Sequence, residues 1–232
     1  MRTPPLVLLA ASATWALPAL PVTFQDALDS VDPTDVIGNP EYFEIDTLKL
    51  AALTGNTLQV DIRFNFGGGT SFDPFTISGF APALNVGDLF FRTAGNTYAY
   101  ILKAHDGLVT NGLYKITDTQ SSATVLGSPA GSYRGDAQVW AAPGGASLLS
   151  TGTQSVVTVN GKKTNLLASL FLDLTSSVLA DLDGGFNVYF ASATCGNDEI
   201  TGTVSGSTVP EPGTWALLGA GMIGIGLLRR RR

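Results

Sequence analysis

Two side chains of this protein could act together as a nucleophile and its base: the single cysteine, Cys195, and the single histidine, His105. A cysteine thiol is activated when an adjacent base takes its proton, so these two residues would have to meet in space. A histidine in a His-Asp-Gly turn is more typical of a surface loop, and an isolated cysteine after a strand is more typical of apolar filling. A serine nucleophile would need the same histidine, and the sequence has no G-x-S-x-G motif. We therefore expect no catalytic residues and no enzyme activity.

Aspartates are the second group of residues that could form a functional site, because calcium is bound by several carboxylate oxygens. Four of them recur at every third position between residues 26 and 35, a spacing that fits neither an EF-hand nor a nonapeptide calcium repeat. Asp181 and Asp183 begin a segment that resembles a calcium loop, but Ser192 stands where an EF-hand has glutamate. Solvated loops and helix N-caps are the explanation that we favour for both groups. We expect no cofactor, with calcium at Asp181 and Asp183 as the open alternative.

Carbohydrate chemistry is a third possibility. A glycosidase needs two carboxylates a few ångströms apart, and the sequence singles out no pair among the 18 acidic residues of the segment 20–209. Tyr98, Tyr100 and Trp140 could stack on the apolar faces of sugar rings. The same side chains also suit a sheet core or cross-strand pairs, which is the interpretation we favour. A carbohydrate-binding or carbohydrate-active domain is therefore the alternative function.

The charge distribution excludes one class of partner. The formal net charge is −6, and five of the 13 basic residues lie at the two ends of the chain. Residues 20–209 keep 8 Lys and Arg against 18 Asp and Glu, which is a net charge of −10. Such a body repels the phosphates of nucleic acids, so we expect no nucleic acid partner.

The elements that would position any site are β-strands. The apolar residues from Leu58 to Phe66 alternate with polar ones, which is the pattern of a half-buried strand. The turn residues Thr54-Gly55-Asn56 precede this strand, and the apolar phase of the segment before them shifts near Thr47. Together these features predict a hairpin with a bulge.

The same pattern of short apolar segments and turn residues recurs along the body. Two such segments flank Ala94-Gly95-Asn96, another pair surrounds Asn160-Gly161, and FNVYFASAT and ITGTVSG close the body. We count about nine to eleven strands and no long amphipathic helix. The pattern predicts an all-β fold, a two-sheet sandwich of the jelly-roll type, as a single domain over residues 20–204. Residues 205–209 are predicted to form a flexible linker.

The N-terminus has the pattern of a secretory signal peptide. One arginine, Arg2, precedes an apolar stretch from Leu6 to Trp15, and small residues suited to cleavage follow between Ala13 and Ala19. A buried N-terminal strand or helix is the alternative, but the prolines near this stretch do not suit regular structure. We therefore predict a signal peptide over residues 1–19 and export by the secretion machinery.

The C-terminus combines an apolar segment with a cluster of positive charge. Trp215 to Leu228 is a run of 14 uncharged residues, about 21 Å long as a helix against a bilayer core of about 30 Å. Neighbouring residues and the long arginine side chains can make up the difference, so we predict a short transmembrane helix. Arg229, Arg230, Arg231 and Arg232 would stay on the cytoplasmic side, which places the body outside.

These features, in this order, resemble a known sorting signal. Pro210, Glu211 and Pro212, the glycine-rich apolar segment and the terminal arginines are similar to the PEP-CTERM signal of Gram-negative bacteria over residues 210–232. In that family an integral-membrane protease, the exosortase, is thought to recognise the Pro-Glu-Pro element and to remove the tail. The resemblance implies the same recognition role for these three residues, with Trp215 to Leu228 as a transient inner-membrane anchor. An ordinary tail anchor is the alternative.

The combined expectation is an exported protein that is anchored briefly, processed by an exosortase and released to the cell surface or the extracellular space. The resemblance implies a producer of exopolysaccharide. A structural or adhesive role in the extracellular matrix or biofilm is the leading hypothesis. A carbohydrate-binding or carbohydrate-active sandwich that contacts extracellular polysaccharide is the alternative.

Overall fold

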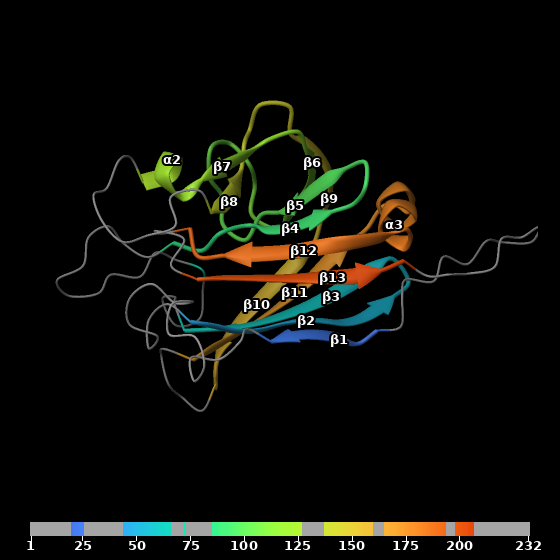
Figure 1. Cartoon of the computed structure of the whole chain (residues 1–232), viewed down its shortest axis with the longest axis horizontal. Coiled ribbons are helices and arrows are strands. Elements are labelled where there is room, and N and C mark those ends of the chain that lie inside the picture. Colours follow the sequence, from blue (N-terminus) through green and yellow to red (C-terminus); the bar gives the residue numbers. More distant parts are fainter. Residues whose placement is uncertain are drawn as a thin grey trace, which may run out of the picture.

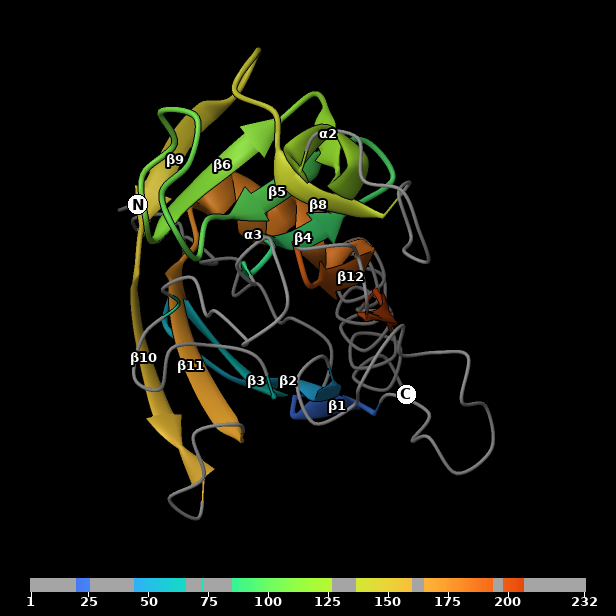
Figure 2. The ribbon, with the colours of Figure 1, turned by 90° about the vertical axis from the view of Figure 1, so that its left-hand side faces the viewer.

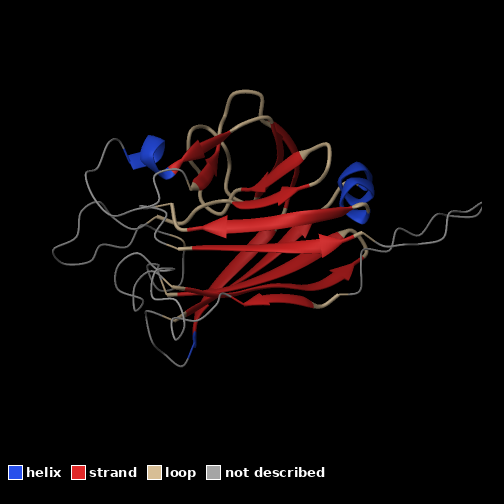
Figure 3. Cartoon of the chain, in the orientation of Figure 1, coloured by secondary structure: helices blue, strands red, loops and turns tan. Residues whose placement is uncertain are grey.

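The computed structural model describes residues 20–25, 44–65, 72, 85–126, 137–159, 165–193 and 198–206. Within these residues the chain forms thirteen strands and two short helices, α2 and α3. The strands form two large antiparallel sheets and one small one. Figure 1 shows the two large sheets as two layers, and Figure 3 shows how strands dominate the described chain. The predicted all-β class is confirmed.

The first large sheet has five strands and shows the predicted alternation. Its order is β1 (Val22–Gln25), β2 (Ile45–Thr54), β3 (Thr57–Phe64), β11 (Leu166–Asp173) and β10 (Thr153–Thr158). Every second side chain of β3 is buried, starting with Leu58. β2 and β3 form the predicted hairpin, and their register shifts between Ile45 and Thr47, where the sequence predicts a bulge. The hairpin turn contains Gly55 at a φ of 60°, a conformation that favours glycine.

The second large sheet has six strands. Its order is β13 (Glu199–Ser205), β12 (Gly185–Ala191), β4 (Leu89–Arg92), β5 (Thr97–Tyr100), β6 (Gly112–Ile116) and β9 (Ser147–Thr151). β4, β5 and β6 follow one another as neighbours, and β12 returns to lie beside β4. The connection from β6 to β12 passes through both other sheets, so this sheet is built from segments that are distant in the sequence.

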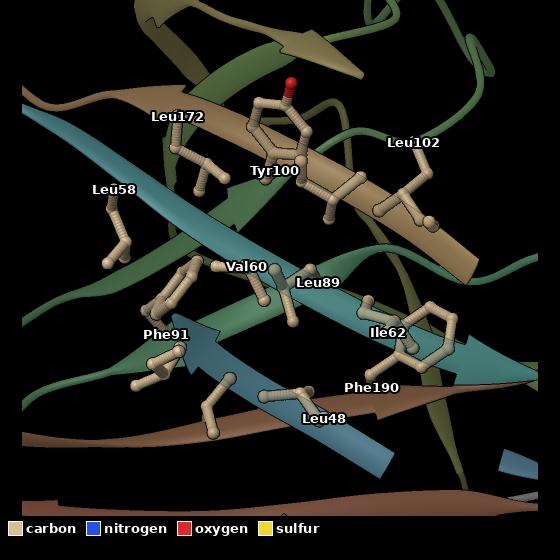
Figure 4. Close-up of a cluster of buried hydrophobic side chains, with 14 of the residues drawn as sticks. Leu48, Leu58, Val60, Ile62, Leu89, Phe91, Tyr100, Leu102, Leu172 and Phe190 are labelled. Carbon is tan, nitrogen blue, oxygen red and sulfur yellow. The ribbon is translucent and has the colours of Figure 1, made fainter. Parts of the chain in front are cut away.

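One hydrophobic core fills the space between the two large sheets. The five-stranded sheet contributes residues such as Leu48, Val60 and Ile62, and the six-stranded sheet contributes Phe91 and Phe190. Figure 4 shows these side chains pointing toward one another from the two sheets. All of them have relative exposures of 0% or 1%, as expected for a close-packed interior. The buried positions of β3 and β11 alternate because the core covers one face of each strand.

A small third sheet covers part of the six-stranded sheet on its outer side. β7 (Thr119–Ser121) and β8 (Gln138–Ala141) pair antiparallel, and α2 (Ser122–Leu126) follows β7 (Figure 2). Phe90 and Tyr114 of the six-stranded sheet, Ile101 of the loop after β5 and Ala141 of β8 belong to a second apolar cluster. The six-stranded sheet is therefore apolar on both faces near its centre.

The first and last strands of the body, β1 and β13, meet at one edge of the molecule. A Cβ atom placed on Gly202 of β13 would lie 2.2 Å from Phe24 Cδ1 of β1. Only a residue without a side chain allows the Phe24 ring to approach so closely. Ser205, which the sequence analysis assigned to the linker, pairs with Gly185 at the end of β13.

Helix α3 (Ser176–Asp183) is an addition that the strand count did not include. Thr175 caps it by accepting a hydrogen bond from the backbone N–H of Val178, and Gly184 follows its last turn. Val178, Leu179 and Leu182 are buried against the shared core. With only eight residues, such a helix depends on this packing more than on its own helical propensity.

Candidate functional site

His105 lies inside the fold. Its Nε2 atom is 2.9 Å from Oδ2 of Asp88, and the two side chains are 5% and 1% exposed. The imidazole ring stacks on Trp140 with 4.4 Å between the ring centroids and 11° between the planes. The expectation of a surface loop was therefore wrong for this side chain, although the neighbouring backbone of Asp106 and Gly107 is exposed. Its partner Asp88 lies 17 positions away in the sequence, so no local pattern marks the pair.

Asp88 connects three segments of the chain. Its carboxylate accepts hydrogen bonds from His105 and from the backbone N–H groups of Leu102 and Ala141. Its own backbone N–H donates to the carbonyl oxygen of Val139 over 2.8 Å. Burial raises the pKa of the Asp88 carboxyl, and the hydrogen bond from His105 acts in the opposite direction. The Asp88 carboxylate therefore connects β8 and the loop after β5 to the start of β4, which is a structural role.

The second ring nitrogen of His105 decides what chemistry this histidine can perform. Nδ1 is buried and has no hydrogen-bond partner among the described residues, with Oδ2 of Asp106 at 3.7 Å. A catalytic histidine would direct this atom at a nucleophile. No serine or threonine hydroxyl among the described residues bonds to it. Cys195 lies outside the described residues, so the expectation that it forms no catalytic pair with His105 stays a prediction.

Of the three aromatic residues considered for sugar stacking, two are buried and the third, Trp140, is half-buried. Tyr98 and Tyr100 are 3% and 0% exposed and belong to the shared core. The Tyr98 hydroxyl donates to Asp181, and the Tyr100 hydroxyl bonds to the carbonyl oxygen of Thr153. Burial raises the pKa of both phenols, and the Asp181 carboxylate adds to the effect at Tyr98. Trp140 stacks on His105 and donates its indole N–H to Val86. The core interpretation is confirmed for Tyr98 and Tyr100.

The two weak calcium candidates lie in the last turn of α3, not in a loop. Oδ2 of Asp181 accepts hydrogen bonds from Tyr98 and from the side-chain amide of Asn96. This arrangement ties the helix to the β4–β5 turn. The described residues contain no group of three or more metal-binding side chains, and the acidic positions between 26 and 35 lie outside them. The expectation of no cofactor, with calcium at Asp181 and Asp183 as the weak alternative, stays a prediction.

The sequence analysis did not single out the surface around Arg92, at the end of β4. Its guanidinium carbon lies 5.3 Å from the ring centroid of Tyr189 and 5.9 Å from that of Phe90. Tyr189 in turn donates its hydroxyl to Glu199 over 2.8 Å. Arg92 borders two open hollows, with volumes of about 360 Å³ and about 160 Å³. A lone arginine directly after two phenylalanines was the one sequence signal for this site.

The residues expected to direct sorting lie outside the described part of the chain. These are Pro210, Glu211 and Pro212, the segment from Trp215 to Leu228, and Arg229 to Arg232. The predicted signal peptide, residues 1–19, also lies outside it. Among the described helices, none has the length and apolar character needed to cross a bilayer.

Comparison with known proteins identifies the C-terminal segment. Residues 208–232 match the PEP-CTERM protein-sorting motif. The resemblance based on the Pro-Glu-Pro element, the apolar run and the arginines is therefore confirmed. The motif implies an exported protein whose sorting at the membrane involves an exosortase. No curated protein and no solved structure is similar enough to this chain to match it.

Proposed function

We propose that this protein is delivered to the cell surface or the extracellular matrix by exosortase processing of its tail, and that its β-body then acts there as a structural or adhesive module. The single observation that carries the proposal is the PEP-CTERM match over residues 208–232. The signal-peptide pattern of residues 1–19 agrees with it, since both ends of the chain then direct the body to the outside.

The interior of the described body supports a role without catalysis. His105, the residue type most used for proton transfer at neutral pH, is enclosed between Asp88 and Trp140. The raised pKa of Asp88 has a structural cause, burial in the joint between β4 and β8. Burial in such a joint is sufficient to perturb a pKa, whereas the perturbed groups of an active site lie in a cleft.

The sorting proposal is tested by a substitution at the recognition element. Glu211→Gln removes one charge outside the apolar segment, and we expect the protein to accumulate at full length in the membrane fraction of a strain that has an exosortase. Glu199→Gln is the matched control, because it makes the same change in the body and keeps an oxygen for the Tyr189 hydroxyl. The measurement is the mass of the protein in the membrane and the medium.

Deleting Arg229 to Arg232 tests the orientation signal separately. Without these charges the tail has no fixed cytoplasmic end, so correctly processed protein should decrease. Normal processing of both variants would contradict the sorting proposal, and normal processing of Glu199→Gln is needed to assign the defect to the tail.

A further inference from the structure

The starting observation is an arginine that is held in place without an acidic partner. Arg92 forms no ion pair within the described residues, and its guanidinium lies over the rings of Tyr189 and Phe90. Attraction between the cation and the ring faces fixes the side chain and reduces the entropy lost on binding. The hydrogen-bonding edges of the guanidinium are left for another group. A guanidinium is a geometric match for a carboxylate or a phosphate.

A second hydrogen-bond donor lies beside Arg92. Asn187 is directly opposite Arg92 in the β12–β4 pair, and such cross-strand neighbours have Cβ atoms about 5 Å apart. The Thr203 hydroxyl donates to Oδ1 of Asn187 over 2.7 Å. Because Oδ1 is used in this way, the amide presents its N–H₂ group as the remaining function. Arginine and asparagine thus form a pair of donors on the same face of the sheet.

The larger hollow next to this pair has the composition of a polar binding site. Its volume of about 360 Å³ lies within the usual range for small-ligand pockets, roughly 300 to 1,000 Å³. Its lining includes the hydroxyl residues Thr93, Thr203 and Ser205, and no acidic residue. The smaller hollow includes Asp118, whose carboxylate would repel an anion. An anionic ligand therefore belongs in the larger hollow.

The acidic character of the body does not oppose a local anion site at physiological salt. Charges more than about 8 Å away are largely screened there, whereas Arg92 would touch the ligand directly. The hydroxyl lining favours a ligand that itself has several hydroxyl groups. Phosphorylated sugars and sugars with a carboxylate share this chemistry. The planar guanidinium of Arg92 can bind the two oxygens of a carboxylate through two parallel hydrogen bonds.

We propose that the hollow bordered by Arg92, Asn187 and Thr203 binds a carboxylate-bearing sugar, with the carboxylate on Arg92 and Asn187 and the sugar hydroxyls on the threonine and serine side chains. The inference extends beyond the sorting proposal and does not depend on it, since it concerns the described body alone. It gives the exported module a ligand class, the uronic acid units of acidic polysaccharides.

The test is isothermal titration calorimetry with the complete 232-residue chain in detergent. Trigalacturonic acid is the probe, maltotriose is the neutral comparison and glucose 1-phosphate is the phosphate comparison. We expect trigalacturonic acid to bind more tightly than the other two. Arg92→Gln should weaken its binding at least about tenfold, the loss expected for one charge-assisted hydrogen-bonded contact.

Asn187→Asp is the sharper variant, because it places a carboxylate opposite Arg92 while leaving an oxygen for the Thr203 hydroxyl. We expect it to abolish binding of trigalacturonic acid. Asn165→Asp is its matched control, since Asn165 also contacts an arginine, Arg63, but on the other sheet. Lys115→Gln controls for the loss of one positive charge outside both hollows.

Unfolding midpoints of all variants show whether the fold is intact. Binding by the two control proteins within twofold of the wild type, together with loss in Arg92→Gln and Asn187→Asp, supports the site. Three results overturn it: equal binding of maltotriose, unchanged affinity in a folded Arg92→Gln variant, or binding of glucose 1-phosphate without binding of trigalacturonic acid.

Discussion

The two large sheets of this protein share one core but differ in what lies on their outer faces. β3 of the five-stranded sheet alternates strictly between buried and half-buried side chains, and no strand or helix of the described residues forms a further layer over its outer face. β4 and β5 of the six-stranded sheet are buried at three of four positions each, because β7, β8 and the nearby loops lie over them. The six-stranded sheet therefore depends on a second, smaller apolar cluster. It also depends on the hydrogen bonds of Asp88, here called the polar joint, which hold the cover formed by β7, β8 and these loops in place.

The difference predicts where mutations will be most harmful. A matched pair of phenylalanines, Phe90 under the cover and Phe171 on the open face, tests it most strongly. Phe90 is 0% exposed and Phe171 is 36% exposed. Phe90→Ala leaves a cavity in the second cluster and should reduce the free energy of unfolding by about 3 to 5 kcal/mol. Phe171→Ala should cost less than about 1 kcal/mol, as surface changes usually do. Urea unfolding measures both, and equal losses would contradict the asymmetry.

A smaller effect is expected at the polar joint. Asp88→Asn keeps the shape of the side chain but replaces one acceptor oxygen with N–H₂, so one of the donors at His105, Leu102 and Ala141 loses its partner. An unsatisfied buried donor costs about 1 to 3 kcal/mol. Asp61→Asn on the open sheet, where Gln59 and Ser169 are the partners, should cost about 1 kcal/mol or less.

Hydrogen exchange would show whether this loss is local. In Asp88→Asn the amides of β7 and β8 should exchange faster while those of β3 and β11 keep their protection. Uniform acceleration over both sheets would mean that the cover does not open separately from the rest of the fold.

The smallest effect is a difference in stability at alkaline pH. The described tyrosines all lie in the six-stranded sheet, and the pKa values of Tyr98 and Tyr100 are raised by burial. Above pH of about 10 the folded state then holds more protons than the unfolded state. The stabilisation is therefore complete below about pH 10 and is lost as the pH rises further. Tyr98→Phe should flatten the decline in unfolding free energy, and an unchanged slope would remove Tyr98 as its source.

The same contrast explains how much of the fold could be predicted from the sequence. The β2–β3 hairpin was predicted with its turn at Gly55 and its bulge near Thr47, because an open outer face imposes a period of two on the sequence. β7 and β8 were not predicted as a separate layer. A strand that is covered on both faces has no such period, so Phe90 and Phe91 give no sign of which sheet face each occupies.

The candidate sites follow the same rule. The tail was predicted well because Pro210 to Arg232 is a continuous motif, and its family match is confirmed. The site around Arg92 could not be predicted, because Asn187 and Thr203 reach it only through the pairing of β4, β12 and β13. His105 was wrongly expected on the surface for the same reason, since Asp88 and Trp140 come from other strands or their ends. Helix α3 was missed although Thr175 and Gly184 mark its two ends, because eight residues give few positions for a helical period.

The placement of the first and last strands of the body has a mechanical consequence. Figure 1 shows that β1 begins and β13 ends at the same pole of the sandwich. If the protein were attached at that end, the opposite end of the body would lie farthest from the point of attachment. A pull on the end of β13 would act along the strand, against seven register positions shared with β12 at once, so the load would be borne in shear and not by opening one hydrogen bond after another.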